Sequence, residues 1–115
     1  MNSQHRKISG YREMSQRDIE LMNKIKALGP LIEEVITEVN NHISAQNRAC
    51  AAFGLSDPAG DQYMSRDELD MVRNARTARE HLDRTQPERW AAIGETHFQE
   101  GLMALTRAVA QPTLF

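Results

Sequence analysis

Apolar residues that recur at steps of three and four constrain the fold of this chain more than any other feature. They keep one phase through Ile19, Met22, Ile25, Leu28, Ile32, Val35, Ile36, Val39 and Ile43. This spacing predicts a long amphipathic helix with one apolar stripe. Ser15 and Asp18 form a capping box at its start, and Met14 with Ile19 occupies the positions of a hydrophobic staple.

The pair Gly29-Pro30 falls inside this stripe. Proline lacks a backbone donor and disfavours the helical conformation of the residue before it, so a break is the default interpretation. The apolar phase nevertheless continues from Ile25 to Val35. We therefore expect a kinked, roughly continuous helix over 16–48, with two abutting helices as the alternative.

Two further helices follow a segment of turn-forming residues at 51–64. The second, over about 66–83, opens on a capping box at 65–68 with a staple of Met64 and Leu69. The third starts at 85–88, with proline in its first turn, and ends at Gln111-Pro112. No strand-like alternation is present. The predicted fold class is all-α, a long antiparallel helical hairpin with a short extra helix.

Each of these two helices also carries an apolar stripe. The stripe of the second comprises Leu69, Val72, Ala75, Ala78 and Leu82, and that of the third comprises Trp90, Ile93, His97 or Phe98, Leu102, Leu105 and Val109. Small residues recur every seven positions in the third helix, at Gly94, Gly101 and Ala108. Because glycine inside a helix costs about 1 kcal/mol relative to alanine, these positions indicate a packing or functional reason. Small residues on one face allow another backbone to approach closely.

The composition fits one domain with a thin core. The 115 residues are 40% hydrophobic and 5% aromatic, and a domain of this size buries proportionally little surface. Helices with one stripe each leave apolar surface over, so we expect a homo-oligomer. The 14 basic and 16 acidic residues nearly balance, which argues against a DNA partner. The single cysteine excludes an internal disulfide, and residues 1–15 have no apolar h-region, so we expect a cytoplasmic protein with no membrane partner.

Enzyme signatures are mostly absent from the sequence. It holds no glycine-rich phosphate loop, no G-x-S-x-G, no H-E-x-x-H and no C-x-x-C. His97 with Glu95 would face different ways on a helix, so an interface or core histidine is favoured over an acid–base pair. Cys50 lies among alanines and is interpreted as a small buried hydrophobe. We expect no catalytic residues, no metal and no cofactor.

Basic residues cluster near the amino end, around Ser9-Gly10-Tyr11. His5, Arg6, Lys7 and Arg12 place four potentially cationic groups within eight residues. A glycine beside an aromatic, just before a capped helix, suits a planar ring and an anion. Asn23, Lys24 and Lys26 follow on the first helix. The alternative is a solvated basic arm, with Lys26 at the edge of the apolar stripe and at a subunit boundary.

These residues carry a family resemblance. The runs His5–Glu13 and Leu21–Gly29 resemble the N-terminal half of phage anti-CBASS sponge proteins, which share a helical hairpin domain with the Thoeris anti-defence sponges. The runs Arg89-Trp90, Ile93-Gly94, Thr96-His97 and Gly101–Pro112 resemble the other half of that family. The chain departs from shorter relatives at about 50–66 and at Gly29-Pro30.

The resemblance implies a phage protein that acts in the cytoplasm of the infected bacterial cell. It implies a homohexamer that binds cyclic dinucleotides and, at separate sites, cyclic trinucleotides, and that withholds them from effectors without degrading them. By position, Tyr11 stacks on a base and Lys26 binds phosphate, with Gly10, Arg12 and Asn23 as supporting contacts and Arg89 as a candidate for the trinucleotide site. Residues 1–14 would form a ligand-contacting arm and 15–115 the hairpin domain, with a loop at about 50–65.

Two other classes remain open at this point. A helical protein–protein adaptor or regulator would use the same stripes without any nucleotide ligand. A nuclease or phosphodiesterase would degrade the signals, and the absence of clustered metal ligands in the sequence weighs against it.

Overall fold

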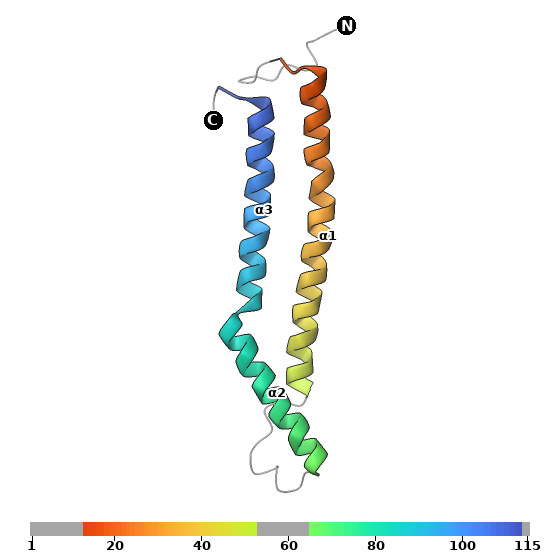
Figure 1. Cartoon of the computed structure of the whole chain (residues 1–115), viewed down its shortest axis with the longest axis vertical. Helices are drawn as coiled ribbons and strands as arrows, with labels where there is room; N and C mark the ends of the chain where they lie inside the picture. Colours follow the sequence, from red (N-terminus) through yellow and green to blue (C-terminus); the bar gives the residue numbers. More distant parts are fainter. Residues whose placement is uncertain (1–12, 53–64, 114–115) are drawn as a thin grey trace. The chain divides into compact units, whose positions relative to one another are not determined.

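The computed structural model describes residues 13–52 and 65–113. These residues form three helices: α1 (Gln16–Ala52), α2 (Arg66–Thr85) and α3 (Pro87–Ala110) (Figure 1). Within the described ranges there is no strand, so the predicted all-α class is confirmed. None of the three described helices combines the length and the hydropathy that crossing a bilayer would require.

Serine caps open the first two helices, as the sequence predicts. The Ser15 hydroxyl accepts from the Asp18 amide at 3.1 Å, and the Ser15 amide donates to the Asp18 carboxylate at 2.9 Å. This is the full reciprocal capping box. Ser65 likewise accepts from the Glu68 amide at 3.2 Å. Met64, the predicted staple partner of Leu69, lies outside the described residues.

The first helix runs through Gly29-Pro30 without ending, so the alternative of two abutting helices is wrong. Helix α1 also continues to Ala52, four residues past the expected end, and the predicted loop therefore starts too early. The physical reason is burial: the Cys50 side chain is only 7% exposed and extends the apolar stripe of α1 by about two turns beyond Ile43. This confirms Cys50 as a buried hydrophobe. The rest of the predicted loop, 53–64, lies outside the described residues.

Proline inside α1 removes one rung of the helix. Pro30 has no N–H, so it cannot donate to the carbonyl of Lys26 four residues earlier. Apart from its two chain neighbours and the nearby backbone of α1 itself, no atom of the described residues lies within 4 Å of the position that a Cβ of Gly29 would take, so Gly29 serves no close contact with that part of the chain. The same is true of Gly94 and Gly101 in α3.

A single residue separates α2 from α3. Gln86 takes the left-handed conformation, with φ 50° and ψ 58°, and its amide donates to the Leu82 carbonyl at 2.9 Å. Its carbonyl in turn accepts from the amides of Arg89 and Trp90 in the first turn of α3. The sequence placed the end of α2 at about 83 and the start of α3 at 85–88, so both positions are close to those observed.

Contacts divide the chain into two compact units. The first combines Met1–Ile36 with Ile93–Phe115, and the second is Thr37–Ala92. In the first unit the early turns of α1 run antiparallel to the later turns of α3: Ile25 and Gly29 share a groove with Met103 and Thr106, whereas Ile32 and Ile36 share one with Glu95 and Phe98 (Figure 1). The antiparallel hairpin is thereby observed within this unit.

The second unit holds most of the buried side chains. Ile43, Cys50, Val72 and Leu82 are each at most 7% exposed, and Ala110 in the first unit is 2% exposed. Many large apolar side chains remain uncovered: Leu28, Leu31, Val35, Val39, Met71, Trp90, Phe98, Met103 and Leu105 are 42–71% exposed. Three residues of the predicted α3 stripe, Trp90, Phe98 and Leu105, are therefore not core residues of this chain.

Replacing Pro30 by alanine should raise the free energy of unfolding. Proline costs about 3 kcal/mol relative to alanine inside a helix. Alanine also gives the unfolded chain more conformational freedom, which reduces the gain in folding stability by about 1 kcal/mol. We expect a gain of about 2 kcal/mol, measured as a higher urea midpoint at fixed protein concentration. Pro87→Ala is the matched control, since a first-turn proline has no hydrogen bond to lose. An unchanged midpoint for Pro30→Ala would contradict this account.

Candidate ligand-binding site

The structure describes three of the six residues predicted to bind ligand. Tyr11, Gly10 and Arg12 lie outside the described residues. Asn23 and Lys26 lie on α1, three residues apart and therefore on one face, and both are exposed. Arg89 lies in the first turn of α3 and is also exposed.

Lys26 lines a groove between α1 and α3 in the first unit. The groove encloses about 500 Å³, and its lining is Ile25, Lys26 and Gly29 from α1 with Leu102, Met103, Ala104, Thr106 and Arg107 from α3. Most of this surface is apolar. Lys26 therefore lies at the edge of the apolar stripe, as the sequence predicts, and the charged ammonium borders an apolar concave surface.

Arg107 is the residue of this groove that the sequence did not single out. It lies in the last turn of α3 and is exposed. Its proximity to Lys26 follows from the antiparallel register of α1 and α3, which brings position 26 beside positions 103–107. The sequence shows that the third helix carries a basic residue near its end. Only the register of α1 and α3 shows that this residue lines the same groove as Lys26.

An adjacent groove shares Gly29 and Leu102 but has the opposite charge. It encloses about 280 Å³ and is lined by Gly29, Pro30, Ile32, Glu33, Ile36, Glu95, Phe98, Gln99 and Leu102. Glu33 and Glu95 are its charged residues. An anion would therefore be attracted to the groove of Lys26 rather than to this neighbour.

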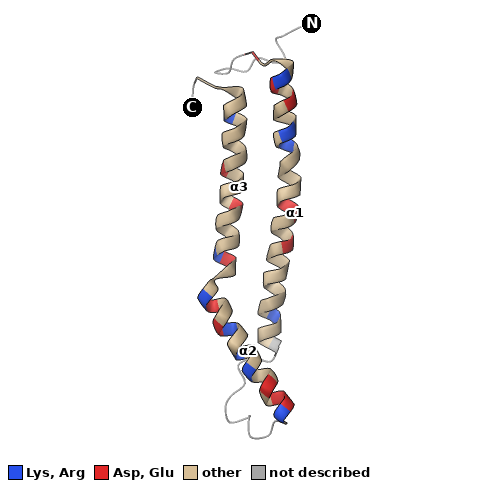
Figure 2. Ribbon diagram, viewed as in Figure 1, with Lys and Arg blue, Asp and Glu red and all other residues tan. Residues whose placement is uncertain are grey.

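Charge is distributed unequally over the helices. Half of the residues of α2 are charged, whereas α3 carries few charged residues and appears largely tan in Figure 2. Because α3 is also where Trp90, Phe98, Met103 and Leu105 are at least half exposed, much of its uncovered surface is apolar and uncharged. Such surface is typical of a contact between proteins.

Arg89 belongs to the second unit, whereas the residues that line the groove of Lys26 belong to the first. Its guanidinium carbon lies 5.8 Å from the centre of the Trp90 ring, and Nη1 donates to the Gln86 side chain at 3.4 Å. The stacked guanidinium offers several exposed N–H donors next to an aromatic face. This is suitable chemistry for an anion attached to a planar ring.

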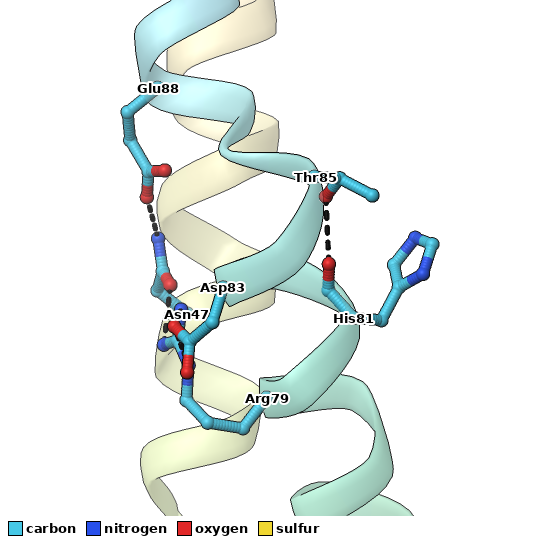
Figure 3. Close-up of polar contacts among 6 residues, drawn as sticks. All are labelled: Asn47, Arg79, His81, Asp83, Thr85 and Glu88. Carbon is cyan, nitrogen blue, oxygen red and sulfur yellow. Dashed lines mark hydrogen bonds and ion pairs between the residues drawn. The ribbon is translucent and has the colours of Figure 1, made fainter.

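Asn47 on α1 links Glu88, the residue before Arg89, to Arg79 on α2 (Figure 3). The Asn47 amide donates to the Glu88 carboxylate at 2.6 Å, and its carbonyl accepts from Arg79 Nη1 at 2.7 Å. Arg79 also pairs with Asp83 at 3.0 Å. One side chain of α1 thus joins both α2 and the first turn of α3 within the second unit. Sequence patterns do not reveal this network, because Asn47 is more than 30 positions away from both Arg79 and Glu88.

The Asn47 hydrogen bond lowers the pKa of the Glu88 carboxyl below its ordinary value of 4.5. The backbone amide of Glu88 and the positive charge of Arg79 lower that pKa further, and desolvation opposes them. The carboxylate is therefore held in its ionised form by donors on α1 and on its own helix. Its position in the first turn of α3 is favourable to a negative charge as well.

A larger groove lies in the second unit, between the end of α1 and α2. It encloses about 730 Å³ and is lined by Gln46, Ala49, Cys50, Met71, Asn74, Ala75, Thr77, Ala78, His81 and Leu82. Its surface is mainly apolar, with amide and hydroxyl groups at the sides. No predicted site residue lines it.

Histidine and metal chemistry find little support in the described part of the chain. Residues 13–52 and 65–113 contain no cluster of three His, Cys, Asp or Glu side chains able to hold a metal ion. The His97 side chain is 74% exposed and lies 3.9 Å from Glu100. His97 is therefore not a core histidine of this chain, and Glu100, one turn ahead, is its observed neighbour rather than Glu95.

Comparison with known proteins identifies the family. Residues 6–110 match the model of the Acb2/Tad1 hairpin domain, and the chain belongs to this family. Over 112 residues, covering 97% of each protein, it is 38% identical to Anti-CBASS protein 2 of Pseudomonas phage JBD67. The resemblance seen in the sequence is thus confirmed, and it extends across nearly the whole chain.

The ionised Glu88 should make stability depend on pH. Because its pKa is lower in the folded chain than the ordinary 4.5, its contribution is complete above about pH 4.5 and is lost as the pH falls through the lowered folded value. Glu88→Gln keeps an acceptor for Asn47 but removes the charge. We expect this variant to be less stable than the wild type near pH 7, measured by urea unfolding, with the difference shrinking in acid.

The matched control is Glu80→Gln on the exposed surface of α2, which should change stability little at any pH. A difference between wild type and Glu88→Gln that stays constant from neutral to strongly acidic solution would contradict the assigned cause.

Proposed function

We propose that this chain is a phage-encoded anti-defence sponge. It binds cyclic oligonucleotide immune signals, sequesters them without degrading them, and so blocks activation of CBASS effectors. The observation that carries this proposal is the identity along nearly the whole chain to a protein named for its anti-CBASS role. The groove of Lys26 supports it, because a cation beside an apolar concave surface suits a nucleotide.

The proposed dinucleotide site combines stacking with charge. Tyr11 stacks on a base, Lys26 binds a phosphate, and Gly10, Arg12 and Asn23 support them. Arg89 belongs to the separate trinucleotide site. Stacking contributes about 1–3 kcal/mol per base and a charge-assisted hydrogen bond about 1.5–3 kcal/mol. Residues 1–14 form the arm that contacts the ligand, and 15–115 form the hairpin domain.

Self-association completes this proposal. A cyclic dinucleotide has two bases and two phosphates related by an approximate two-fold axis, and a two-fold interface presents each residue twice. One tyrosine and one lysine per chain then match the ligand. The hexamer that the family resemblance implies would combine two-fold with three-fold axes and hold both ligand types. The exposed apolar residues of α1 and α3 supply surface for such contacts.

The proposed protein is not an enzyme and needs no cofactor or metal. It acts in the cytoplasm of the infected bacterial cell, where the signals are made. Its partners are cyclic oligonucleotides and further copies of itself, rather than DNA or a membrane. Sequestration depends on tight binding and not on turnover, so the chain needs no catalytic groups for this role.

Capture followed by release tests the function directly. The protein is incubated with cyclic GMP–AMP, cyclic di-AMP and a cyclic triadenylate, then removed by heat, and the supernatant is analysed by chromatography. We expect the free ligand to fall before heating and to return intact afterwards. A cleaved product would identify a nuclease or phosphodiesterase, and unchanged free ligand throughout would favour the adaptor.

Substitutions at the proposed site should abolish dinucleotide capture. Tyr11→Ala removes the stacking face, and Lys26→Ala removes the charge; with each effect doubled by symmetry, we expect a loss of about 100-fold or more in affinity by calorimetry. Tyr11→Phe should retain binding. Lys24→Ala is the control for Lys26, because residues two apart on a helix face different ways. Light scattering should show the same oligomer in all variants. Wild-type affinity in Tyr11→Ala or Lys26→Ala would contradict the site.

A further inference from the structure

Pro30 leaves one backbone acceptor of the groove of Lys26 without its regular donor. In an α-helix the carbonyl of Lys26 would accept from the amide of residue 30, and proline has no N–H to give. No side chain of the described residues donates to this carbonyl either. A residue that lines the groove therefore carries a carbonyl that can accept from a ligand.

Gly29 leaves the turn around this carbonyl uncovered. A helical side chain covers the surface over the turn that precedes its own Cα, so a side chain at position 29 would lie over the turn of Ile25 and Lys26. Glycine has no side chain, and it lines the groove itself. Apart from its chain neighbours and the nearby backbone of α1, no atom of the described residues lies within 4 Å of the position that its Cβ would take. Within the described part of the chain, the space over that turn is therefore open to a ligand.

The opposite wall of the groove presents an acceptor as well. Thr106 of α3 is half-buried, and its hydroxyl donates its single hydrogen to the Leu102 carbonyl at 2.9 Å. Toward the groove this oxygen can therefore only accept. Lys26 and Thr106 thus each contribute an acceptor to one groove, from two helices of the first unit. A ligand group with hydrogens to donate suits this arrangement better than a group that has only lone pairs.

A ligand held by the Lys26 ammonium would displace water from this surface. A carbonyl that loses water and gains no other donor destabilises the complex by more than a hydrogen bond to the same carbonyl stabilises it. The open carbonyl would therefore discriminate between ligands as well as bind them. The amino group of adenine or guanine carries two hydrogens, enough for both acceptors, whereas a ribose hydroxyl carries one.

We propose that the Lys26 carbonyl accepts a hydrogen bond from the nucleoside part of the ligand, with the amino group of a base as the donor, while the Lys26 ammonium binds phosphate. This inference rests on the proposed function and deepens it by assigning ligand specificity to the backbone at Gly29-Pro30. The proline that weakens α1 is thereby the residue that keeps an acceptor available for the ligand.

The test returns the missing N–H to the helix. Pro30→Ala gives the Lys26 carbonyl its helical donor, so this variant should bind cyclic di-AMP about five- to tenfold more weakly in calorimetry, although it is more stable than the wild type. The matched control places N-methylalanine at position 30, in a full chain made by joining residues 1–49 to 50–115 at Cys50. N-methylalanine lacks both the proline ring and the N–H, so this chain should bind as tightly as the wild type. Equal weakening in both chains, or wild-type affinity in Pro30→Ala, would overturn the inference.

Two analogues of cyclic di-AMP identify the donor. One replaces the amino groups of both bases by hydrogen, and the other replaces the ribose 2′-hydroxyls by fluorine. The first should bind the wild type about tenfold more weakly and should lose the sensitivity to Pro30→Ala, whereas the second should keep that sensitivity. Loss of sensitivity with the fluorinated analogue alone would overturn the amino group as the donor. Sensitivity that persists with both analogues would overturn the inference as a whole.

An NMR signal of the carbonyl itself separates this inference from the proposed function. Lys26 is followed by Ala27, and neither Lys7 nor Lys24 precedes an alanine. Lysine labelled with ¹³C at the carbonyl and alanine labelled with ¹⁵N therefore give one correlated signal, from the Lys26 carbonyl. In the wild type, cyclic di-AMP should shift this ¹³C resonance in the direction in which Pro30→Ala shifts it without ligand.

The outcomes of this measurement are distinct. If cyclic di-AMP binds the wild type and the Lys26 carbonyl resonance does not move in that direction, the inference fails and the proposed function stands. If no cyclic nucleotide binds the wild type, the proposed function fails and the inference falls with it.

Discussion

The antiparallel pairing of α1 with the later turns of α3 is the contact on which the candidate site depends. Half-buried apolar residues such as Ile25, Ile32 and Leu102 hold the two helices side by side in the first unit. The register that they set places position 26 beside 103–107 and positions 29–36 beside 95–102. A slip of one turn, about 5.4 Å, would change which residues of α3 lie beside Lys26.

Local chemistry made much of the fold predictable. The capping serines at 15 and 65 determine where α1 and α2 begin, and those hydrogen bonds are observed. The periodicity of the apolar residues was also sufficient to predict that α1 continues through Pro30. The end of α1 was missed because it depends on burial of Cys50 against other elements, which overrides the weak turn signals after it. Tertiary burial is not written in any short window of the sequence.

The candidate site was predictable only in part. Lys26 could be placed at the edge of the stripe because its position relative to Ile25 and Leu28 follows from helix geometry. Arg107 and Asn47 could not be found in this way, since their partners lie on other helices and depend on register. The exposure of Trp90 and Phe98 was likewise hidden, because a stripe of apolar residues looks the same whether the chain itself or another copy covers it.

Pro30 has a consequence for how long a captured molecule would stay bound. The missing rung at Lys26 makes the middle of α1 easier to open than the turns on either side. A ligand that binds Lys26 would therefore also reduce the motion of that turn. The entropy lost in this way would offset part of the binding free energy. The rate of ligand dissociation would then depend on local opening of α1 near Pro30, rather than on fraying at the ends of the helix.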